Sequence, residues 1–397
     1  MFHTDFPSSD VTRRDTASGR VLNVAIVLGT RPEAVKLAPV FRAMQSSSLF
    51  SPVLVNTGQH REMLEALLGR LRLTATHDLS VMRPCQQLSS LTARLVGGLG
   101  DVLRAARPDL LVVQGDTSST LCGALAAFYE HIPVAHVEAG LRSGVIDDPF
   151  PEEMNRRLVT RMTRWHFAPT PGAAAALAAE AVPAEQVVVT GNTVIDNLLW
   201  ARERATGRSA FRTHGRGVIV TLHRRENQGG TMRALASALL RLAERRDVEL
   251  LVPVHKSPAV RDALLPVLSG CPRITLTEPL DYFDFISTLD DCELVLTDSG
   301  GVQEEAPSFD KPVLVLRNTT ERPEVVRAGA ARLIGTDPLA VQAAVTSLLD
   351  DRTQYDRMAE ASNPFGDGHA SARILRRLAE DFGLDMNPTP TPRIVAA

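Results

Sequence analysis

Short apolar runs rich in β-branched residues alternate with helix-like segments along most of the chain. The run at 21–29 reads VLNVAIVLG, and similar runs stand at 52–58, 109–116, 132–140 and 186–192. A strand that is apolar throughout is buried on both faces, which is typical of a parallel sheet covered by helices. The sequence therefore predicts an α/β fold, with helices such as 32–45 and 119–129 between the strands.

The same rhythm starts again after Gly191. Further strand candidates follow at 217–223, 248–255, 273–280, 293–301 and 311–317. A chain of 397 residues also exceeds the size at which a single core usually keeps growing. We predict two Rossmann-like, doubly wound domains, at 21–190 and 191–366. A polar leader at 1–20 and a Pro-rich tail at 386–397 are predicted to be disordered and flexible, respectively.

Composition narrows the class of protein. A net charge of -3, with scattered Lys and Arg, gives no basic stripe for nucleic acid. The cysteines are Cys85, Cys122, Cys271 and Cys292, and their wide spacing predicts reduced thiols and no metal site. No apolar run reaches the roughly 20 residues of a membrane helix, and no signal peptide is evident. We expect a cytoplasmic enzyme without membrane contact.

Polar clusters follow the strand candidates in both halves. They stand at 29–33, 114–117, 136–140, 223–227, 254–256 and 297–301. In open parallel sheets, ligands bind at the carboxyl ends of the strands. Three clusters from each half therefore predict one shared site in a cleft between the halves, although solvated loops would also be polar.

An anion site is indicated by glycines and arginines at these strand ends. Backbone N–H groups at Ser299, Gly300 and Gly301 can approach a diphosphate, although such a pair of glycines also eases a tight turn. Guanidinium groups hold phosphate oxygens with paired hydrogen bonds, and the candidates are Arg31, Arg224, Arg225, Arg317 and Arg322. Glu305 could accept hydrogen bonds from a ribose, and Lys36 could serve the phosphates or the sugar.

Carboxylates and histidines supply candidates for proton transfer. Asp116, Glu138 and Glu152 end or follow segments of the first half, and crowded acids raise one pKa, which yields an acid and base pair. Asp116 could instead only cap the helix that follows it. His223 and His255 come from the second half and could donate a proton to a leaving group.

The chain resembles the non-hydrolysing UDP-N-acetylglucosamine 2-epimerases of bacteria. The resemblance runs from about residue 21 to 384 and includes GTRPEAVKLAP (29–39), QGDTSST (114–120), HVEAGLRSG (136–144), PFPEEMNRR (149–157), GNTVIDNL (191–198), HRREN (223–227) and TDSGGVQEEAP (297–307). It implies a glycosyltransferase-B-like architecture, a C-terminal helix at about 367–385 that returns to the first domain, a homodimer, and no cofactor.

The resemblance also implies roles for individual residues. Asp116, Glu138, Glu152 and His223 are the expected catalytic residues. Together with the strand-end clusters, it places at the UDP-sugar Arg31, Lys36, Arg156, Arg224, Glu226, Asn227, His255, Phe285, Ser299, Gly300, Gly301, Glu305 and Arg322, with Phe285 near the uracil. The implied reaction is reversible inversion at C2 of UDP-N-acetylglucosamine, through elimination of UDP and its readdition to a bound 2-acetamidoglucal.

Other functions stay open at this point. Hydrolysing relatives of the same fold release the free sugar and UDP, and a glycosyltransferase would need a similar diphosphate site. Asn318 occupies a position that is often an acidic residue in the family. This difference would also be consistent with a modified sugar as the substrate. Gln59, Arg61 and Glu62 match a segment that binds an activating UDP-sugar in some relatives, but residues 82–86 depart from that pattern. A sugar-nucleotide sensor would not need three acids.

Overall fold

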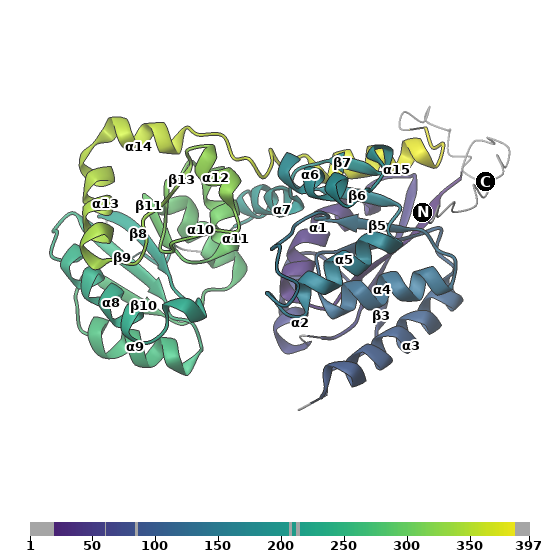
Figure 1. Cartoon of the computed structure of the whole chain (residues 1–397), viewed down its shortest axis with the longest axis horizontal. Coiled ribbons are helices and arrows are strands. Elements are labelled where there is room, and N and C mark those ends of the chain that lie inside the picture. Colours follow the sequence, from purple (N-terminus) through teal and green to yellow (C-terminus); the bar gives the residue numbers. More distant parts are fainter. Residues whose placement is uncertain (1–19, 60, 84–85, 206–208, 212–214, 386–397) are drawn as a thin grey trace, which may run out of the picture. The chain divides into compact units, whose positions relative to one another are not determined.

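The computed structural model describes residues 20–59, 61–83, 86–205, 209–211 and 215–385 (Figure 1). The predicted tail at 386–397, Cys85, and all of the predicted leader except Arg20 lie outside the described residues. So do the side chains of Arg61 and Glu62, two residues of the predicted activator segment.

The first parallel sheet has the strand order β3-β2-β1-β4-β5-β6-β7. Its strands are β1 (Leu22–Leu28), β2 (Phe50–Asn56), β3 (His77–Asp78), β4 (Leu110–Gln114), β5 (Val134–Val137), β6 (Trp165–Ala168) and β7 (Val187–Val189). The helices between them are α1 (Arg31–Gln45), α2 (Arg61–Arg70), α3 (Leu88–Ala106), α4 (Ser118–Tyr129), α5 (Glu152–Met162) and α6 (Pro171–Ala179). Because β1 pairs in parallel with both β2 and β4, the chain reverses its direction of winding there.

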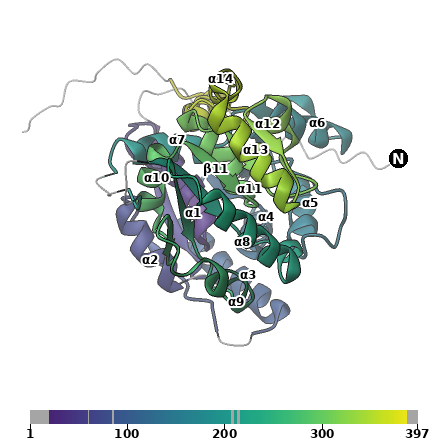
Figure 2. The ribbon, with the colours of Figure 1, turned by 90° about the vertical axis from the view of Figure 1, so that its left-hand side faces the viewer.

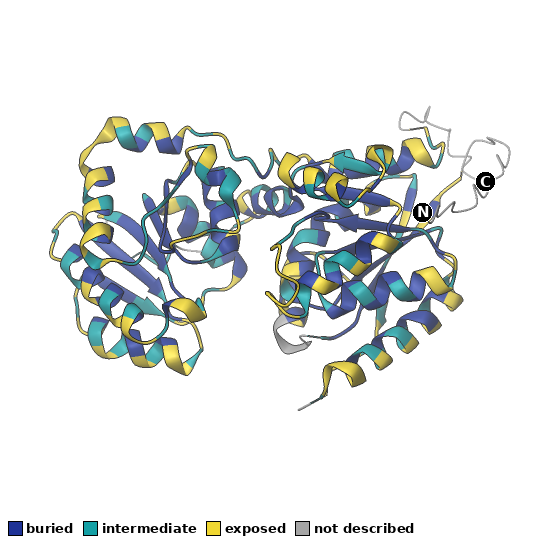
Figure 3. Ribbon diagram, viewed as in Figure 1, coloured by how far each residue is buried: buried dark blue, intermediate teal, exposed yellow. Residues whose placement is uncertain are grey.

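Both faces of the first sheet are covered, as the apolar runs predict. Ala25 and Val27 of β1 pack in a core with Leu95 and Leu99 of α3. Alternate residues of a strand point to opposite faces, so Ile26 faces the other way, and it too is fully buried. Figure 3 shows the central strands of both sheets as buried segments, whereas the edge strands β3 and β7 of the first sheet are only partly buried.

The second sheet repeats the pattern, with the order β10-β9-β8-β11-β12-β13. Its strands are β8 (Arg216–Thr221), β9 (Val248–Pro253), β10 (Ile274–Thr277), β11 (Leu294–Thr297), β12 (Val313–Val315) and β13 (Ala331–Leu333). The remaining helices are α7 (Thr193–Arg202), α8 (Gly230–Leu242), α9 (Pro258–Leu268), α10 (Tyr282–Asp291), α11 (Gly300–Glu305), α12 (Pro323–Arg327), α13 (Pro338–Asp350), α14 (Arg352–Ala359) and α15 (Ala370–Asp381). Helices α8 and α13 lie side by side (Figure 2), and their apolar residues share one core with the strands. The prediction of two Rossmann-like sheets is confirmed.

The sequence prediction missed strands β3, β6 and β13. Each has only two to four residues, and β13 carries an arginine, so none gives the long apolar run that marks a buried strand. The returning helix predicted at 367–385 forms only over Ala370–Asp381 as α15. None of the helices in the described part of the chain is both long and apolar enough to cross a membrane.

The chain divides into two compact units. The first unit holds residues 1–136, 157–165 and 371–397, and the second unit holds 137–156 and 166–370. Within the first unit, the ring of Phe382, next to α15, packs on Trp165 with the ring centroids 5.4 Å apart. The predicted domain boundary near residue 190 and the cleft between the domains stay predictions.

Candidate active site

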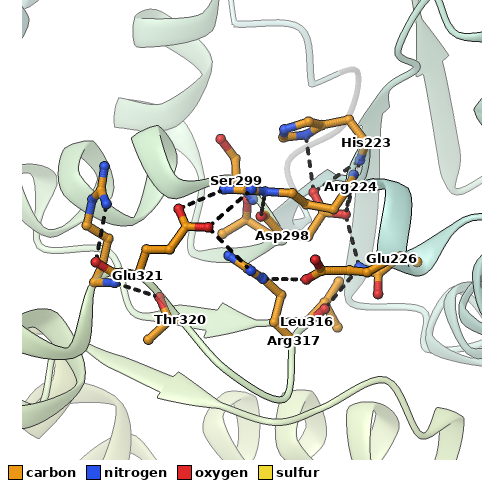
Figure 4. Close-up of polar contacts among 12 residues, drawn as sticks. His223, Arg224, Glu226, Asp298, Ser299, Leu316, Arg317, Thr320 and Glu321 are labelled. Carbon is orange, nitrogen blue, oxygen red and sulfur yellow. Dashed lines mark hydrogen bonds and ion pairs between the residues drawn. The ribbon is translucent and has the colours of Figure 1, made fainter. Parts of the chain in front are cut away.

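A buried aspartate organises the carboxyl edge of the second sheet. Asp298 follows β11 and accepts hydrogen bonds from the backbone N–H groups of His223 and Arg224, at 3.0 Å each to the nearest oxygen, and from the Asn227 amide at 3.1 Å (Figure 4). Strands β8 and β11 are neighbours at the point where the winding reverses, which is where open α/β sheets bind ligands. Asp298 thus fixes the loop after β8 against the loop after β11.

Asp298 also orients His223. The Nδ1 atom of His223 lies 3.1 Å from Oδ1 of Asp298, so Nδ1–H donates to the carboxylate. Burial of Asp298 opposes ionisation, but the hydrogen bond and charge of His223 outweigh it and hold the pKa of Asp298 below its usual range. Because the buried carboxylate holds Nδ1, Nε2 of His223 is the atom left to exchange a proton with a ligand.

His255, which follows β9, stacks beside His223. The two ring centroids are 5.8 Å apart, and the planes differ by 29°. Burial, followed by repulsion from His223, lowers the pKa of His255. The backbone N–H of Ser257 donates to Nδ1 of His255 at 3.1 Å, which also favours the neutral ring. His255 therefore stands beside His223 as a neutral hydrogen-bonding group.

Two guanidinium groups flank the glycine after β11. A Cβ atom built on Gly300 would lie 3.6 Å from Nη2 of Arg224 and 3.9 Å from Nη2 of Arg322. Gly300 begins helix α11, and its buried backbone lies beside the half-buried Ser299. Two arginines therefore lie close to one point at the sheet edge, as the strand-end arginines of the sequence predict, whereas the backbone N–H of Ser299 donates to the Thr297 hydroxyl at 2.9 Å.

Acidic residues hold these arginines in place. Both oxygens of Glu321 accept from Arg224, at 3.4 and 3.3 Å, and burial of Glu321 is outweighed by Arg224 and its neighbours, so its pKa is lowered. Arg317 is buried and donates from Nε to Glu226 at 2.7 Å. Glu226 was predicted at the substrate, and its partner in the structure is Arg317.

Glu304 and Asn192 are site residues that the sequence analysis missed. The side-chain amide of Asn192 donates to Glu138 at 2.9 Å and to Glu304 at 3.0 Å. Nε of Arg322 pairs with the other oxygen of Glu304. Burial opposes the charge on Arg322, but Glu304 and then Glu138 outweigh it and raise its pKa. Both residues lie in the motifs GNTVIDNL and TDSGGVQEE, but no pattern in these motifs indicates which side chains face inward.

The backbone of Glu138 is strained. Its φ of 63° lies in the left-handed region, which side chains with a Cβ rarely adopt. Such strain persists where surrounding contacts over-determine it, and it concentrates at functional sites. This conformation points the buried carboxylate of Glu138 to Asn192.

In the first unit, Asp116 lies half-buried in the loop after β4. The N-cap of α4 is Thr117, whose hydroxyl accepts from the N–H of Thr120 at 3.1 Å, so Asp116 is not the cap. The buried ring of His136 contacts the carbonyl of Gly115 at 2.7 Å and fixes the other side of the loop. This geometry favours proton transfer as the role of Asp116 over the alternative that it only caps α4.

The remaining predicted residues lie at other element ends. Glu152 begins α5 and is half-buried, whereas Arg156 on the same helix donates to the buried Glu153 at 3.1 Å. Asn227 is buried, and its amide also donates to the Leu316 carbonyl at 3.1 Å, so it positions its loop. Half-buried positions are occupied by Arg31, Lys36, Phe285 and Glu305, while Gly301 is exposed.

The structure therefore brings together the predicted clusters of the second half. His223, Arg224, Ser299, Gly300 and Arg322 converge, with His255 beside them. Arg31, Lys36 and Asp116 belong to the first unit. Their convergence with the second-half residues, and the role of each residue, stay predictions.

These features define a class of protein: a glycosyltransferase-B-like α/β fold, with a candidate anion site rich in arginine at the switch point of its second sheet. The family model described as UDP-N-acetylglucosamine 2-epimerase matches residues 42–379. The UDP-N-acetylglucosamine 2-epimerase of Yersinia pestis is 44% identical over 369 residues, covering 90% of this chain and 98% of that protein. The chain belongs to the UDP-N-acetylglucosamine 2-epimerase family.

Two further relatives agree. The UDP-N-acetylglucosamine 2-epimerase of Escherichia coli K12 is 42% identical over 369 residues, covering 90% of this chain and 98% of that protein. The crystal structure of the Neisseria meningitidis enzyme bound to UDP-GlcNAc is 40% identical, with a TM-score of 0.83, and covers 90% of this chain and 100% of that one. The predicted family and fold are confirmed.

Proposed function

We propose that this protein reversibly converts UDP-N-acetylglucosamine to UDP-N-acetylmannosamine without releasing the free sugar. One observation carries the proposal beyond family membership. The guanidinium groups of Arg224 and Arg322 both lie close to the point where a Cβ of Gly300 would stand, at 3.6 and 3.9 Å, so a diphosphate there would meet two positive charges. This arrangement suits both binding of UDP and stabilisation of UDP as a leaving group.

The chemistry follows from the substrate. The C2 hydrogen is not next to a carbonyl, so the C1–O bond must break first and leave positive charge on the ring. A carboxylate among Asp116, Glu138 and Glu152 then takes the C2 proton, and the electron pair of that C–H bond forms the C1–C2 double bond. Readdition of UDP to C1, with a proton delivered to the opposite face of C2, restores the UDP-sugar in inverted form.

His223 is proposed to assist the leaving diphosphate. Asp298 holds its Nδ1, so Nε2 can donate a hydrogen bond to a phosphate oxygen as negative charge develops. Because Nδ1–H is already given to Asp298, donation from Nε2 requires a ring that carries both protons. His223 would then act on UDP, and the carboxylates on the sugar.

Proton NMR in deuterated water tests this function. The purified protein is incubated with UDP-N-acetylglucosamine, and we expect UDP-N-acetylmannosamine with deuterium at C2, because the abstracted proton exchanges with solvent. Formation of free N-acetylmannosamine and UDP would instead show that the protein is a hydrolysing epimerase. Absence of turnover would contradict the proposal and reopen a modified sugar or a transferase.

We also propose that the enzyme is a cytoplasmic homodimer, as the family resemblance implies. An exposed apolar stripe supports self-association: Phe150 is 69% exposed, Met154 41% and Leu158 45%, at four-residue spacing along α5 and the segment before it. Apolar patches rimmed by polar residues frequently mark protein interfaces.

Charged substitutions on this stripe are expected to break the dimer. Replacing Met154 and Leu158 together with lysine should shift the protein from dimer to monomer, because each interface would bury four new charges. Light scattering after size-exclusion chromatography gives the mass. The control is Leu339→Lys, since Leu339 is 70% exposed on α13, a helix that carries no residue of the stripe. A monomeric wild type, or a dimeric double variant, would refute the interface.

A further inference from the structure

A single buried carboxylate joins two strand-end loops at the switch point of the first sheet. Oε2 of Glu33 accepts from the backbone N–H groups of Gly29 and Thr30, at 2.9 and 2.7 Å. Its Oε1 accepts from the hydroxyls of Thr117 and Thr120, at 2.6 and 3.1 Å. One oxygen thus binds the loop after β1, and the other binds the loop after β4.

These two loops carry residues assigned to the reaction. Arg31 follows Thr30 directly, and Asp116 precedes Thr117 directly. Strands β1 and β4 are paired neighbours, so the two loops leave the same edge of the sheet side by side. Glu33 itself is only 1% exposed. It is therefore placed to fix the loops without touching a ligand.

Close packing at the same point leaves the loop little freedom. A Cβ atom on Gly29 would lie 2.0 Å from the Thr57 hydroxyl and 2.5 Å from that of Ser119. Those hydroxyls are hydrogen-bonded to each other at 2.8 Å, and Ser119 donates to Gln59 at 2.9 Å. The loop after β1 is thus held by packing on one side and by Glu33 on the other.

We propose that Glu33 is a positioning residue for the epimerisation. It fixes the loop before Arg31 and the loop that carries Asp116 relative to each other. The proposal rests on the proposed function and deepens it. An ordinary capping role would need only the hydrogen bonds to its own helix start, at Gly29 and Thr30. The hydrogen bonds from the hydroxyls of Thr117 and Thr120 are not needed for capping, and they are the contacts that would position the neighbouring loop.

The electrostatics predict which substitution is tolerated. Burial raises the pKa of Glu33, although the hydroxyl and backbone hydrogen bonds partly offset this. A carboxyl group whose pKa is raised on folding costs stability as the pH rises above its unfolded value. Glutamine carries no such cost: its amide oxygen can accept from the backbone pair, and its NH₂ can donate to the two hydroxyls.

The test compares Glu33→Gln, Glu33→Leu and Thr117→Val, together with the Glu33→Leu/Thr117→Val pair. Each is assayed by the NMR turnover assay well below its Tm, and UDP binding is measured by calorimetry. We expect Glu33→Leu to lower kcat by about 10- to 100-fold, since small misplacements of catalytic groups have effects of that order. Glu33→Gln should keep most of kcat and should not lower Tm. UDP affinity should fall less than kcat, because Arg224 and Arg322 belong to the second unit and only Arg31 of the proposed phosphate contacts lies next to a loop that Glu33 holds.

A positioning role and a merely structural role differ in two readouts. If Glu33 and Thr117 act through one contact, the double variant loses little more kcat than Glu33→Leu alone. A lower Tm with unchanged kcat for folded Glu33→Leu would overturn the inference and leave a capping role. Fully additive losses would also overturn it. A wild-type protein without turnover would overturn the proposed function itself, and this inference with it.

Discussion

Replacing Asp116 with asparagine is expected to lower kcat by about 10²- to 10⁴-fold, the usual contribution of one positioned acid or base. Asparagine keeps the size of the side chain but can neither take nor give the C2 proton. Because the arginines and Gly300 of the second unit are untouched, UDP should bind with unchanged affinity. Turnover by NMR and UDP binding by calorimetry measure the two effects separately.

The control for Asp116→Asn is Asp101→Asn on α3. The Asp101 side chain is 79% exposed and pairs with Arg104, so its loss should leave turnover unchanged. Wild-type kcat in Asp116→Asn would remove Asp116 from the proton transfer and leave Glu138 and Glu152 as candidates. Loss of UDP binding in Asp116→Asn would assign it to substrate binding instead.

The parallel α/β class of both sheets could be predicted from the sequence because buried parallel strands leave a simple signal. Runs such as 21–29 and 293–301 are apolar throughout, and the turns after them are rich in glycine and polar residues. The missed strands show the limit of this signal. The three-residue strands β7 and β12 lie inside longer apolar runs and were predicted, whereas β13 reads ARL and has no such run, so its pairing with β12 is what defines it.

The candidate site could be predicted by position but not by contact. Strand-end location indicated Arg224, Gly300 and Arg322, which lie close together in the structure. It could not indicate that Asn192 links Glu138 and Glu304. These two glutamates lie 54 and 112 residues away from Asn192 along the chain. Strand-end location also could not show which of two adjacent acidic residues faces the site.

The pair at 304 and 305 illustrates this last limit. Glu305 was chosen for the ribose, whereas Glu304 is the buried partner of Arg322. Neighbouring residues on a helix point about 100° apart, and only the packed structure decides which one faces inward.

Replacing Asp298 with alanine is expected to weaken both the second unit and its affinity for UDP. The Asp298 side chain is fully buried and accepts the N–H groups of His223 and Arg224, the amide of Asn227 and the ring of His223. Leaving such donors without an acceptor costs about 1–3 kcal/mol for each group that water cannot reach. We expect the free energy of unfolding to fall by at least about 2 kcal/mol on that scale. UDP affinity should fall at least tenfold, because the Arg224 loop loses its anchor.

The pH dependence of that loss identifies its cause. A carboxyl group whose pKa is lowered on folding contributes stability above its unfolded pKa, and this contribution is lost as the pH falls through the folded pKa. The pKa of Asp298 is lowered, so the stability difference between wild type and Asp298→Asn should be full at pH 7 and shrink steadily at acidic pH below the usual Asp range. Urea unfolding across this range measures it, with the exposed Asp262→Asn as a control expected to stay within about 0.5 kcal/mol of wild type. A difference independent of pH would mean that Asp298 acts through packing alone, and its charge would then have no part in orienting His223.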